Sequence, residues 1–196
     1  LMHAFYFGSG SRRLFGIYEP ARLVRSRSRA VLLCHPWGSE YLHAHKSMRQ
    51  LAILLAEAGI DSLRFDYYST GDSAGDDAEG DLAGWRQDIL TAAEELTSLA
   101  GVTRVTLVGL RLGATLAAQA SRDLGKAVDG LVLWDPIVEG SAYIEELHAV
   151  CRAQPIAIKE PVSRPASLGG GFEILGFPLT GRIHASGTGE VQRMLQ

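Results

Sequence analysis

Short apolar segments alternate with longer amphipathic segments along most of the chain. Four short segments have the composition of strands that a parallel sheet buries on both faces, at 30–34, 61–65, 105–109 and 130–135. After each of them, apolar residues recur at helical spacing, at 46–58, 82–99, 112–122 and 141–153. Two further strands joined by a Gly/Ser turn are predicted at 4–7 and 13–18. The alternation predicts an α/β fold, with a mostly parallel sheet and helices on both of its faces.

Local sequence signals mark the ends of the first two predicted helices. A loop, HPWGSEYLHAH, leads into the first helix, which Gly59 ends, and Asp81 caps the second. The apolar face of the first helix is expected to contain Met48, Leu51, Leu54, Leu55 and Ala58.

The regular pattern stops after residue 154. Residues 1–154 therefore form the predicted core, and 155–180 are a Pro- and Gly-containing excursion away from the sheet. The tail at 181–196 shows no strand pattern and no convincing helix.

Composition narrows the possible partners. A net charge of −3 offers no broad attraction for nucleic acid or for an anionic membrane. No apolar run reaches 18 residues, and no basic-then-apolar stretch opens the given sequence, so neither a membrane span nor a signal peptide is expected. Cys34 and Cys151 are far apart in sequence and fit no metal or redox spacing, which favours a reducing compartment and predicts a cytoplasmic protein.

The stretch VTLVGLRLGATLAA at 105–118 contains the first candidate site. Gly109 and Gly113 bracket Arg111 where a strand runs directly into a helix, which is the context of a G-x-S-x-G nucleophile elbow. The N–H of Leu112 then points into the cleft at the helix N-terminus. The alternative is a plain strand–helix turn. GLRLGA lacks the glycine pattern that binds dinucleotide phosphates, and no cofactor is expected.

The second candidate is the loop His35-Pro36-Trp37-Gly38, which follows the first buried strand. The backbone N–H of Trp37 and that of Leu112 can form an oxyanion hole, the pair of donors that stabilises an attacked carbonyl. The alternative is that His35 and Trp37 only pack the loop.

These segments, in the order HPWG, FDYYSTGDS, GLRLGA and LWDPIV, resemble the α/β-hydrolase superfamily over about residues 5–180. They are most similar to serine-aminopeptidase-like hydrolases, including those associated with the exosortase system, some of which also carry a GLRLGA elbow. Residues 66–73 resemble the D-x-R-G-x-G-x-S loop of that family, with departures at Tyr68 and Thr70. GFEILGFPLT resembles the segment that leads into the family's cap domain.

The resemblance implies hydrolysis of an ester, thioester or amide, with a serine at position 111, a late acid and a final histidine. Arginine stays protonated and has no lone pair for attack, so catalysis is expected to be impaired or absent. Asp135 lies at the end of the predicted strand at 130–135, where some hydrolases carry their catalytic acid. The alternatives are that Asp135 caps a helix or forms an ion pair with Arg111. Nothing after Thr180 resembles the last two strands of the family, so the chain reads as C-terminally truncated with an unpaired sheet edge.

Other residues with reactive or metal-binding side chains are expected to be structural. His35, His43 and His45 lie within eleven residues of one another, but no carboxylate or thiolate completes a recognisable metal-ligand set with them. The residues considered are Ser69, Ser73, Cys34, Asp66, His35, His43, His45, His148 and His184.

Two functions remain open from the sequence. One is a hydrolase acting on a small acyl substrate. The other is a non-catalytic protein that binds a small anion through Arg111 and His35, since a helix N-terminus and a guanidinium both attract negative charge. The alternative for Arg111 is a purely structural role, in an ion pair with Asp135 or Asp66.

Overall fold

The computed structural model describes residues 2–22, 29–76, 78–153, 162–163 and 171–179 of the 196-residue chain. Six strands form the larger sheet: β1 (His3–Ser9), β2 (Arg12–Glu19), β3 (Ala30–Cys34), β4 (Asp61–Phe65), β5 (Val105–Leu110) and β6 (Val128–Trp134). The helices are α1 (Ser39–Glu57), α2 (Leu82–Ala100), α3 (Leu112–Leu124) and α4 (Gly140–Ala153), with a 3-10 turn at Gly125–Ala127. The predicted α/β class with a mostly parallel sheet is confirmed.

The order of strands in this sheet is β1-β2-β4-β3-β5-β6. β3 pairs with β4 and β5 in parallel, β5 pairs with β6 in parallel, and β2 joins β4 in antiparallel fashion. Because β4 and β5 lie on opposite sides of β3, the winding of the chain reverses at β3. The carboxyl ends of β3 and β5 flank this switch point, where open α/β sheets bind their ligands.

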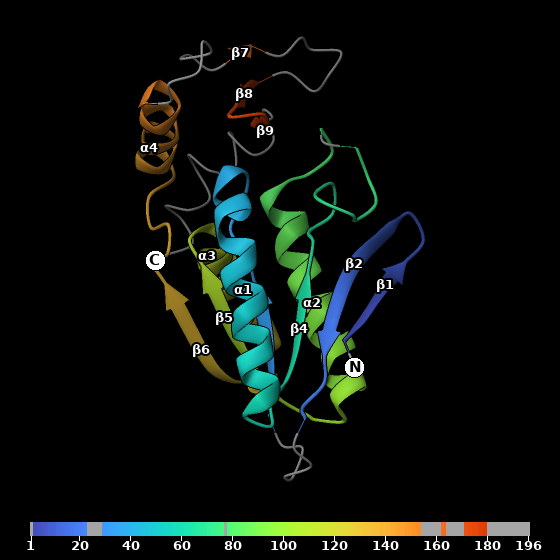
Figure 1. Cartoon of the computed structure of the whole chain (residues 1–196). Helices are drawn as coiled ribbons and strands as arrows, with labels where there is room; N and C mark the ends of the chain where they lie inside the picture. The colour runs from blue at the N-terminus through green and yellow to red at the C-terminus, as the bar shows by residue number, and fades with distance from the viewer. Residues whose placement is uncertain (1, 23–28, 77, 154–161, 164–170, 180–196) are drawn as a thin grey trace.

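Helices cover both faces of the sheet, α1 in front and α2 with α3 behind in Figure 1. The residues of β3 alternate between the two faces. Leu32 and Cys34 belong to the large apolar cluster that includes α2 and α3, whereas Val31 and Leu33 pack with Ala52 of α1. A strand buried on both faces therefore needs the continuous apolar sequence that β3 has.

Helix α1 begins seven residues earlier than the predicted start, at Ser39 rather than Lys46. Gly38, with a φ of 65°, turns the chain into the helix. The first two turns were missed because their residues are mostly polar and lack an apolar period. The prediction for the helix face was wrong at Leu54 and at Ala58, which are exposed, while Ala52 and Ala56 are buried.

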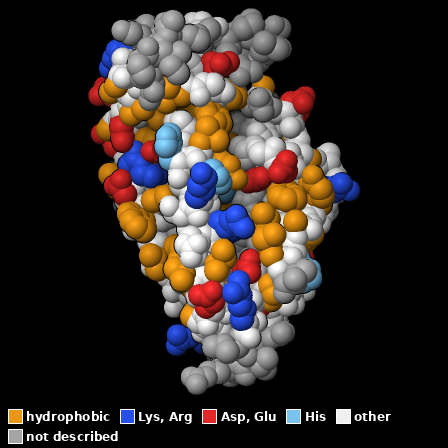
Figure 2. Space-filling model, in the orientation of Figure 1, with side chains coloured by type: hydrophobic (Ala, Val, Ile, Leu, Met, Phe, Trp, Pro, Cys, Tyr) orange, Lys and Arg blue, Asp and Glu red, His pale blue; other side chains and the backbone are white. Residues whose placement is uncertain are grey.

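The prediction that the strand near 130–135 is buried was wrong. β6 is an edge strand among the described residues, and its apolar side chains are largely exposed, with Val132 at 50% and Trp134 at 71%. Hydrophobic side chains accordingly gather on the surface over β6 (Figure 2). An apolar sequence indicates that a strand can be buried, but its place in the sheet decides whether it is.

The described residues of the predicted excursion form a small antiparallel sheet, which the sequence pattern did not reveal. Its strands are β7 (Val162–Ser163), β8 (Phe172–Ile174) and β9 (Phe177–Leu179). Leu175 and Gly176 connect β8 to β9 with positive φ values of 54° and 84°, the conformation of a two-residue hairpin turn. The boundaries at 154 and 180 stay predictions, and the tail at 181–196 lies outside the described residues. No described helix has the length and apolar character needed to span a membrane.

Candidate functional site

The turn between β5 and α3 is sharp and strained. Arg111 has a φ of 54° and a ψ of −121°, a conformation that a residue with a Cβ adopts only at a cost. Its backbone N–H donates to the carbonyl oxygen of Trp134 at 3.0 Å, which joins the turn to the end of β6. A Cβ on Gly109 would lie 2.4 Å from the Cα of Ala114, so glycine is required for this close approach of strand and helix. This is the strand–turn–helix geometry that a nucleophile elbow needs.

The loop after β3 lies directly against the start of α3. A Cβ on Gly113 would be 2.3 Å from the carbonyl oxygens of both Cys34 and His35. Trp37 and Leu112 are both buried, and neither backbone N–H donates a hydrogen bond to another described residue. The structure thus brings both predicted oxyanion donors to the same end of the sheet. Their use as an oxyanion hole stays a prediction.

The side chain of Arg111 contacts three carboxylates. Its Nε donates to Oε1 of Glu40 at 2.7 Å, its Nη1 to Oδ2 of Asp135 at 3.1 Å, and its Nη2 to Oε2 of Glu146 at 2.6 Å. The hydroxyl of Tyr143 donates to Oε2 of Glu40 at 2.7 Å, and the guanidinium carbon lies 5.5 Å from the centre of its ring. These five residues are called the Arg111 cluster below. Of the alternatives that the sequence left open, the ion pair with Asp135 is the one present.

The Arg111 cluster joins α1, the end of β6 and α4 through one cation. The Arg111 side chain is only 15% exposed. This burial lowers the pKa of Arg111, but hydrogen bonds to Glu40 and Glu146 and the charges of these two residues outweigh it and raise the pKa above its ordinary value. Burial and the nearby Glu40 also raise the pKa of the Tyr143 hydroxyl. The guanidinium therefore remains charged, and all three of its nitrogens donate to carboxylates.

Several solved structures of hydrolases have an architecture similar to that of this chain. Est1E from Butyrivibrio proteoclasticus, in a structure with ferulic acid bound, matches with a TM-score of 0.65 at 18% identity, over 97% of this chain and 71% of that one. A serine hydrolase without a lid from Xanthomonas campestris matches with a TM-score of 0.53 at 25% identity, over 63% of this chain and 56% of that one. A proline iminopeptidase from Mycobacterium smegmatis matches with a TM-score of 0.59 at 15% identity, over 79% and 50%.

The chain has an α/β-hydrolase fold. The predicted resemblance is confirmed at this level, and the finer likeness to exosortase-associated hydrolases stays a prediction. No protein-family model matches the sequence, and no curated protein matches it significantly. The chain spans little more than half of the length of the Xanthomonas protein and half of that of the iminopeptidase.

Next to the turn between β5 and α3, His35 and Asp66 lie side by side. His35 Nδ1 is 2.7 Å from the carbonyl oxygen of Pro36, which can only accept, so Nδ1 carries the proton. The other ring nitrogen, Nε2, is 3.9 Å from Asp66 Oδ1 and has no hydrogen-bond partner in the described chain. Burial lowers the pKa of His35, although the charge of Asp66 acts in the opposite direction. Asp66 accepts from the Tyr41 hydroxyl and from the Asp72 N–H, each at 3.0 Å, which is the structural hydrogen bonding expected of it.

The other candidate nucleophiles are held within the structure. Ser73 donates to the carbonyl oxygen of Asp66 at 2.6 Å. Ser69 has a φ of 63°, and its buried hydroxyl has no partner among the described residues. Cys34 is fully buried, which raises the pKa of its thiol, so the reactive thiolate is disfavoured.

The remaining histidines lie on helices or beyond the described residues. His43 and His45 belong to α1, not to the predicted loop, and each places Nδ1 2.7 Å from a backbone oxygen of its own helix. His148 lies on α4, and His184 is outside the described residues. The described part of the chain contains no group of three or more side chains that could hold a metal ion.

Sequence reasoning missed Glu40, Tyr143 and Glu146 as members of the site. Glu40 was assigned to a loop because the start of α1 was placed too late. Tyr143 and Glu146 are three residues apart in α4 and so share one face of it, but nothing local indicates that this face meets Arg111.

Proposed function

We propose that this chain is a protein of the hydrolase lineage for acyl bonds (esters, thioesters or amides) that does not perform serine chemistry at its elbow. The observation that carries the proposal is the Arg111 cluster. Arg111 occupies the strained apex where the fold holds a nucleophile, and three carboxylates bind its guanidinium. A protonated guanidinium has no lone pair with which to attack a carbonyl. At this position the side chain instead joins three elements by ion pairs.

The surroundings of the other candidate nucleophiles support the same proposal. Ser73 already donates to a backbone oxygen, and the hydroxyl of Ser69 is buried against Gly75, where a Cβ would lie 2.5 Å from it. Neither hydroxyl donates to His35, the one buried histidine ring at this end of the described sheet. A serine without a base is a weak nucleophile.

The test is labelling by a fluorophosphonate probe, combined with turnover assays. The purified chain is incubated with the probe and, separately, with an aryl ester, an acyl thioester and an aminoacyl anilide. We expect no adduct by intact mass spectrometry and no turnover above that of the heat-unfolded protein. An adduct on any serine, or saturable turnover, would overturn the proposal, and the variants Ser69→Ala and Ser73→Ala would identify the residue responsible.

Anion binding by Arg111 and His35, the alternative function from the sequence, has less support. The guanidinium nitrogens already donate to carboxylates, and burial favours the neutral form of His35. Thermal shifts with acetate, phosphate and sulfate would be compared between the wild type and Arg111→Met. We expect equal shifts in both proteins, whereas a larger shift in the wild type would assign the anion to Arg111.

We also propose a small acyl compound as the ligand and the cytoplasm as the location. Cys34 and Cys151 are both buried and lie far apart in the sequence, which suits a reducing compartment. Detection of the protein in an oxidising compartment would contradict the proposed location.

A further inference from the structure

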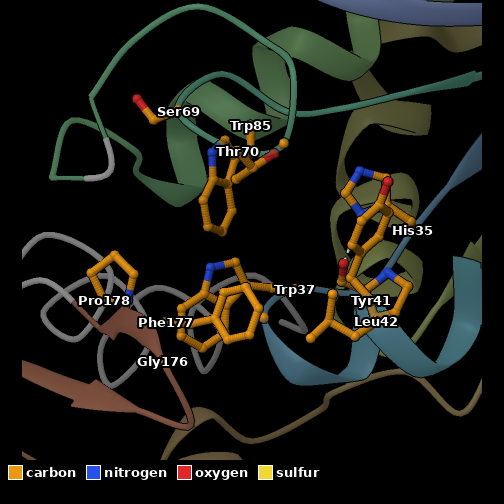
Figure 3. Close-up of a pocket in the computed structure, with 13 residues that line it drawn as sticks. His35, Trp37, Tyr41, Leu42, Ser69, Thr70, Trp85, Gly176, Phe177 and Pro178 are labelled. Carbon is orange, nitrogen blue, oxygen red and sulfur yellow. Dashed lines mark hydrogen bonds between the residues drawn. The ribbon is translucent and has the colours of Figure 1, made fainter.

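A cavity of about 230 Å³ lies on the far side of the loop after β3 and does not include Arg111. The loop after β3, the loop after β4, the start of α2 and the β8–β9 hairpin enclose it. Three aromatic rings form its walls, those of Trp37, Trp85 and Phe177, with Leu42 and Pro178 at its border (Figure 3). The cavity with these walls is called the aromatic pocket below.

The two tryptophans of the aromatic pocket differ in the state of their indole N–H groups. Trp85 donates its N–H to the carbonyl oxygen of Tyr68 at 2.9 Å, so the fold itself uses this donor. Trp37 differs, because its indole N–H donates to no described residue. Figure 3 shows the indole nitrogen of Trp37 on the side of the ring that faces Trp85. An acceptor placed between the two rings could therefore take a hydrogen bond from the Trp37 N–H.

No carboxylate, lysine or arginine lines the aromatic pocket. Its titratable lining residues are His35 and Tyr41. Burial lowers the pKa of His35 and raises that of Tyr41, so both side chains favour their neutral forms. A charged ligand would lose its hydration here without gaining an ion pair, which selects for an uncharged one.

We propose that the aromatic pocket binds an uncharged, flat aromatic group that carries a hydrogen-bond acceptor, such as an aryl amide. The ring lies against Trp37, Trp85 and Phe177, and the carbonyl oxygen accepts from the Trp37 indole N–H. Size agrees with this, because apolar cavities of about 150 Å³ hold benzene, and the larger volume has room for one substituent. The aromatic pocket shares Trp37 with the predicted oxyanion hole but does not include Arg111, and the proposed binding requires no chemistry at the elbow.

The probe is benzamide, and the readout is a two-dimensional NMR titration of the ¹⁵N-labelled chain. The chain has three tryptophans, so three indole N–H signals are expected, assigned with Trp37→Phe and Trp134→Phe variants. We expect saturable binding, with the Trp37 indole proton moving downfield and the Trp134 signal unchanged. Toluene, which has no acceptor, should shift the neighbouring signals without this downfield change. Cyclohexanecarboxamide, which has no flat ring, should bind about fivefold more weakly than benzamide.

Two variants separate the ring contacts from the hydrogen bond. Trp37→Phe should weaken benzamide about fivefold, the net worth of one hydrogen bond, and leave toluene binding unchanged. Phe177→Leu, on the small hairpin, should weaken both ligands about threefold, whereas Tyr6→Leu, an exposed aromatic on β1, should weaken neither. If Trp37→Phe does not fold, the downfield shift and the Phe177→Leu variant decide. No saturable benzamide binding, or binding that is the same in Phe177→Leu, would overturn the proposal.

Discussion

Replacing Arg111 by methionine removes the central charge of the Arg111 cluster and keeps most of the side-chain volume. The partly buried bond to Glu40 is worth about 1–2 kcal/mol. The Asp135 and Glu146 side chains are 68% and 54% exposed, so their ion pairs contribute roughly 0.2–1 kcal/mol each. Methionine is as strained as arginine at this backbone conformation, so no relief of strain offsets the loss. We expect the free energy of unfolding to fall by about 2 kcal/mol.

A second substitution tests whether charge is the cause. In the wild type, Glu146→Gln should lower the free energy of unfolding by roughly 0.5 kcal/mol, because it removes an ion pair. With Arg111→Met present, Glu146→Gln should raise it by roughly 0.5 kcal/mol, because it now relieves repulsion between neighbouring carboxylates. The assay is urea denaturation at neutral pH, monitored by far-ultraviolet circular dichroism. All variants are fitted with one common m-value, the slope of the free energy of unfolding against urea concentration.

Arg86 provides the matched control. It forms an exposed ion pair with Asp123 at 3.5 Å, with both side chains more than 40% exposed. Arg86→Met should therefore change the free energy of unfolding by at most about 0.5 kcal/mol. Equal losses for Arg86→Met and Arg111→Met, or the same sign for Glu146→Gln in both backgrounds, would refute this account of the Arg111 cluster.

Three further predictions concern the glycine contact, a buried histidine and the sheet edge. Gly113→Ala should lower the free energy of unfolding by more than about 2 kcal/mol, because backbone oxygens leave no space for a Cβ. The control is Gly101→Ala, where the space is open but φ is positive, and it should lower the free energy of unfolding by about 1 kcal/mol in the same urea assay. Burial lowers the pKa of His35 below 6.5, so the unfolded chain binds the proton more readily. The free energy of unfolding should then fall as the pH drops below about 6.5, by at most about 1.4 kcal/mol per unit, and His35→Gln should remove this slope; a slope that persists would assign it elsewhere. Val132→Lys, on the exposed strand β6, should reduce concentration-dependent association measured by light scattering, and unchanged scattering would show that this edge does not mediate it.

The sequence by itself determined most of the secondary structure and the fold class. The segments predicted at 30–34 and 61–65 coincide with β3 and β4 residue for residue. Hydrophobic periodicity reports which residues a strand or helix can bury, and this information is local in the sequence. The spacing of Gly109 and Gly113 likewise placed Arg111 at the turn between β5 and α3, because close packing of strand and helix requires glycine there.

Only the tertiary structure decided what Arg111 contacts. Its partners Glu40 and Glu146 lie 71 residues before it and 35 residues after it, on helices whose approach depends on how both pack over the sheet. The same holds for the exposure of β6, which follows from its place at the edge of the described sheet, and for the aromatic pocket, which unites four separate segments of the chain. Local pattern specifies the faces of an element, whereas the contacts between faces arise only when all the elements pack together. For that reason the sequence could identify the cation at the turn between β5 and α3 but could not identify the carboxylates around it.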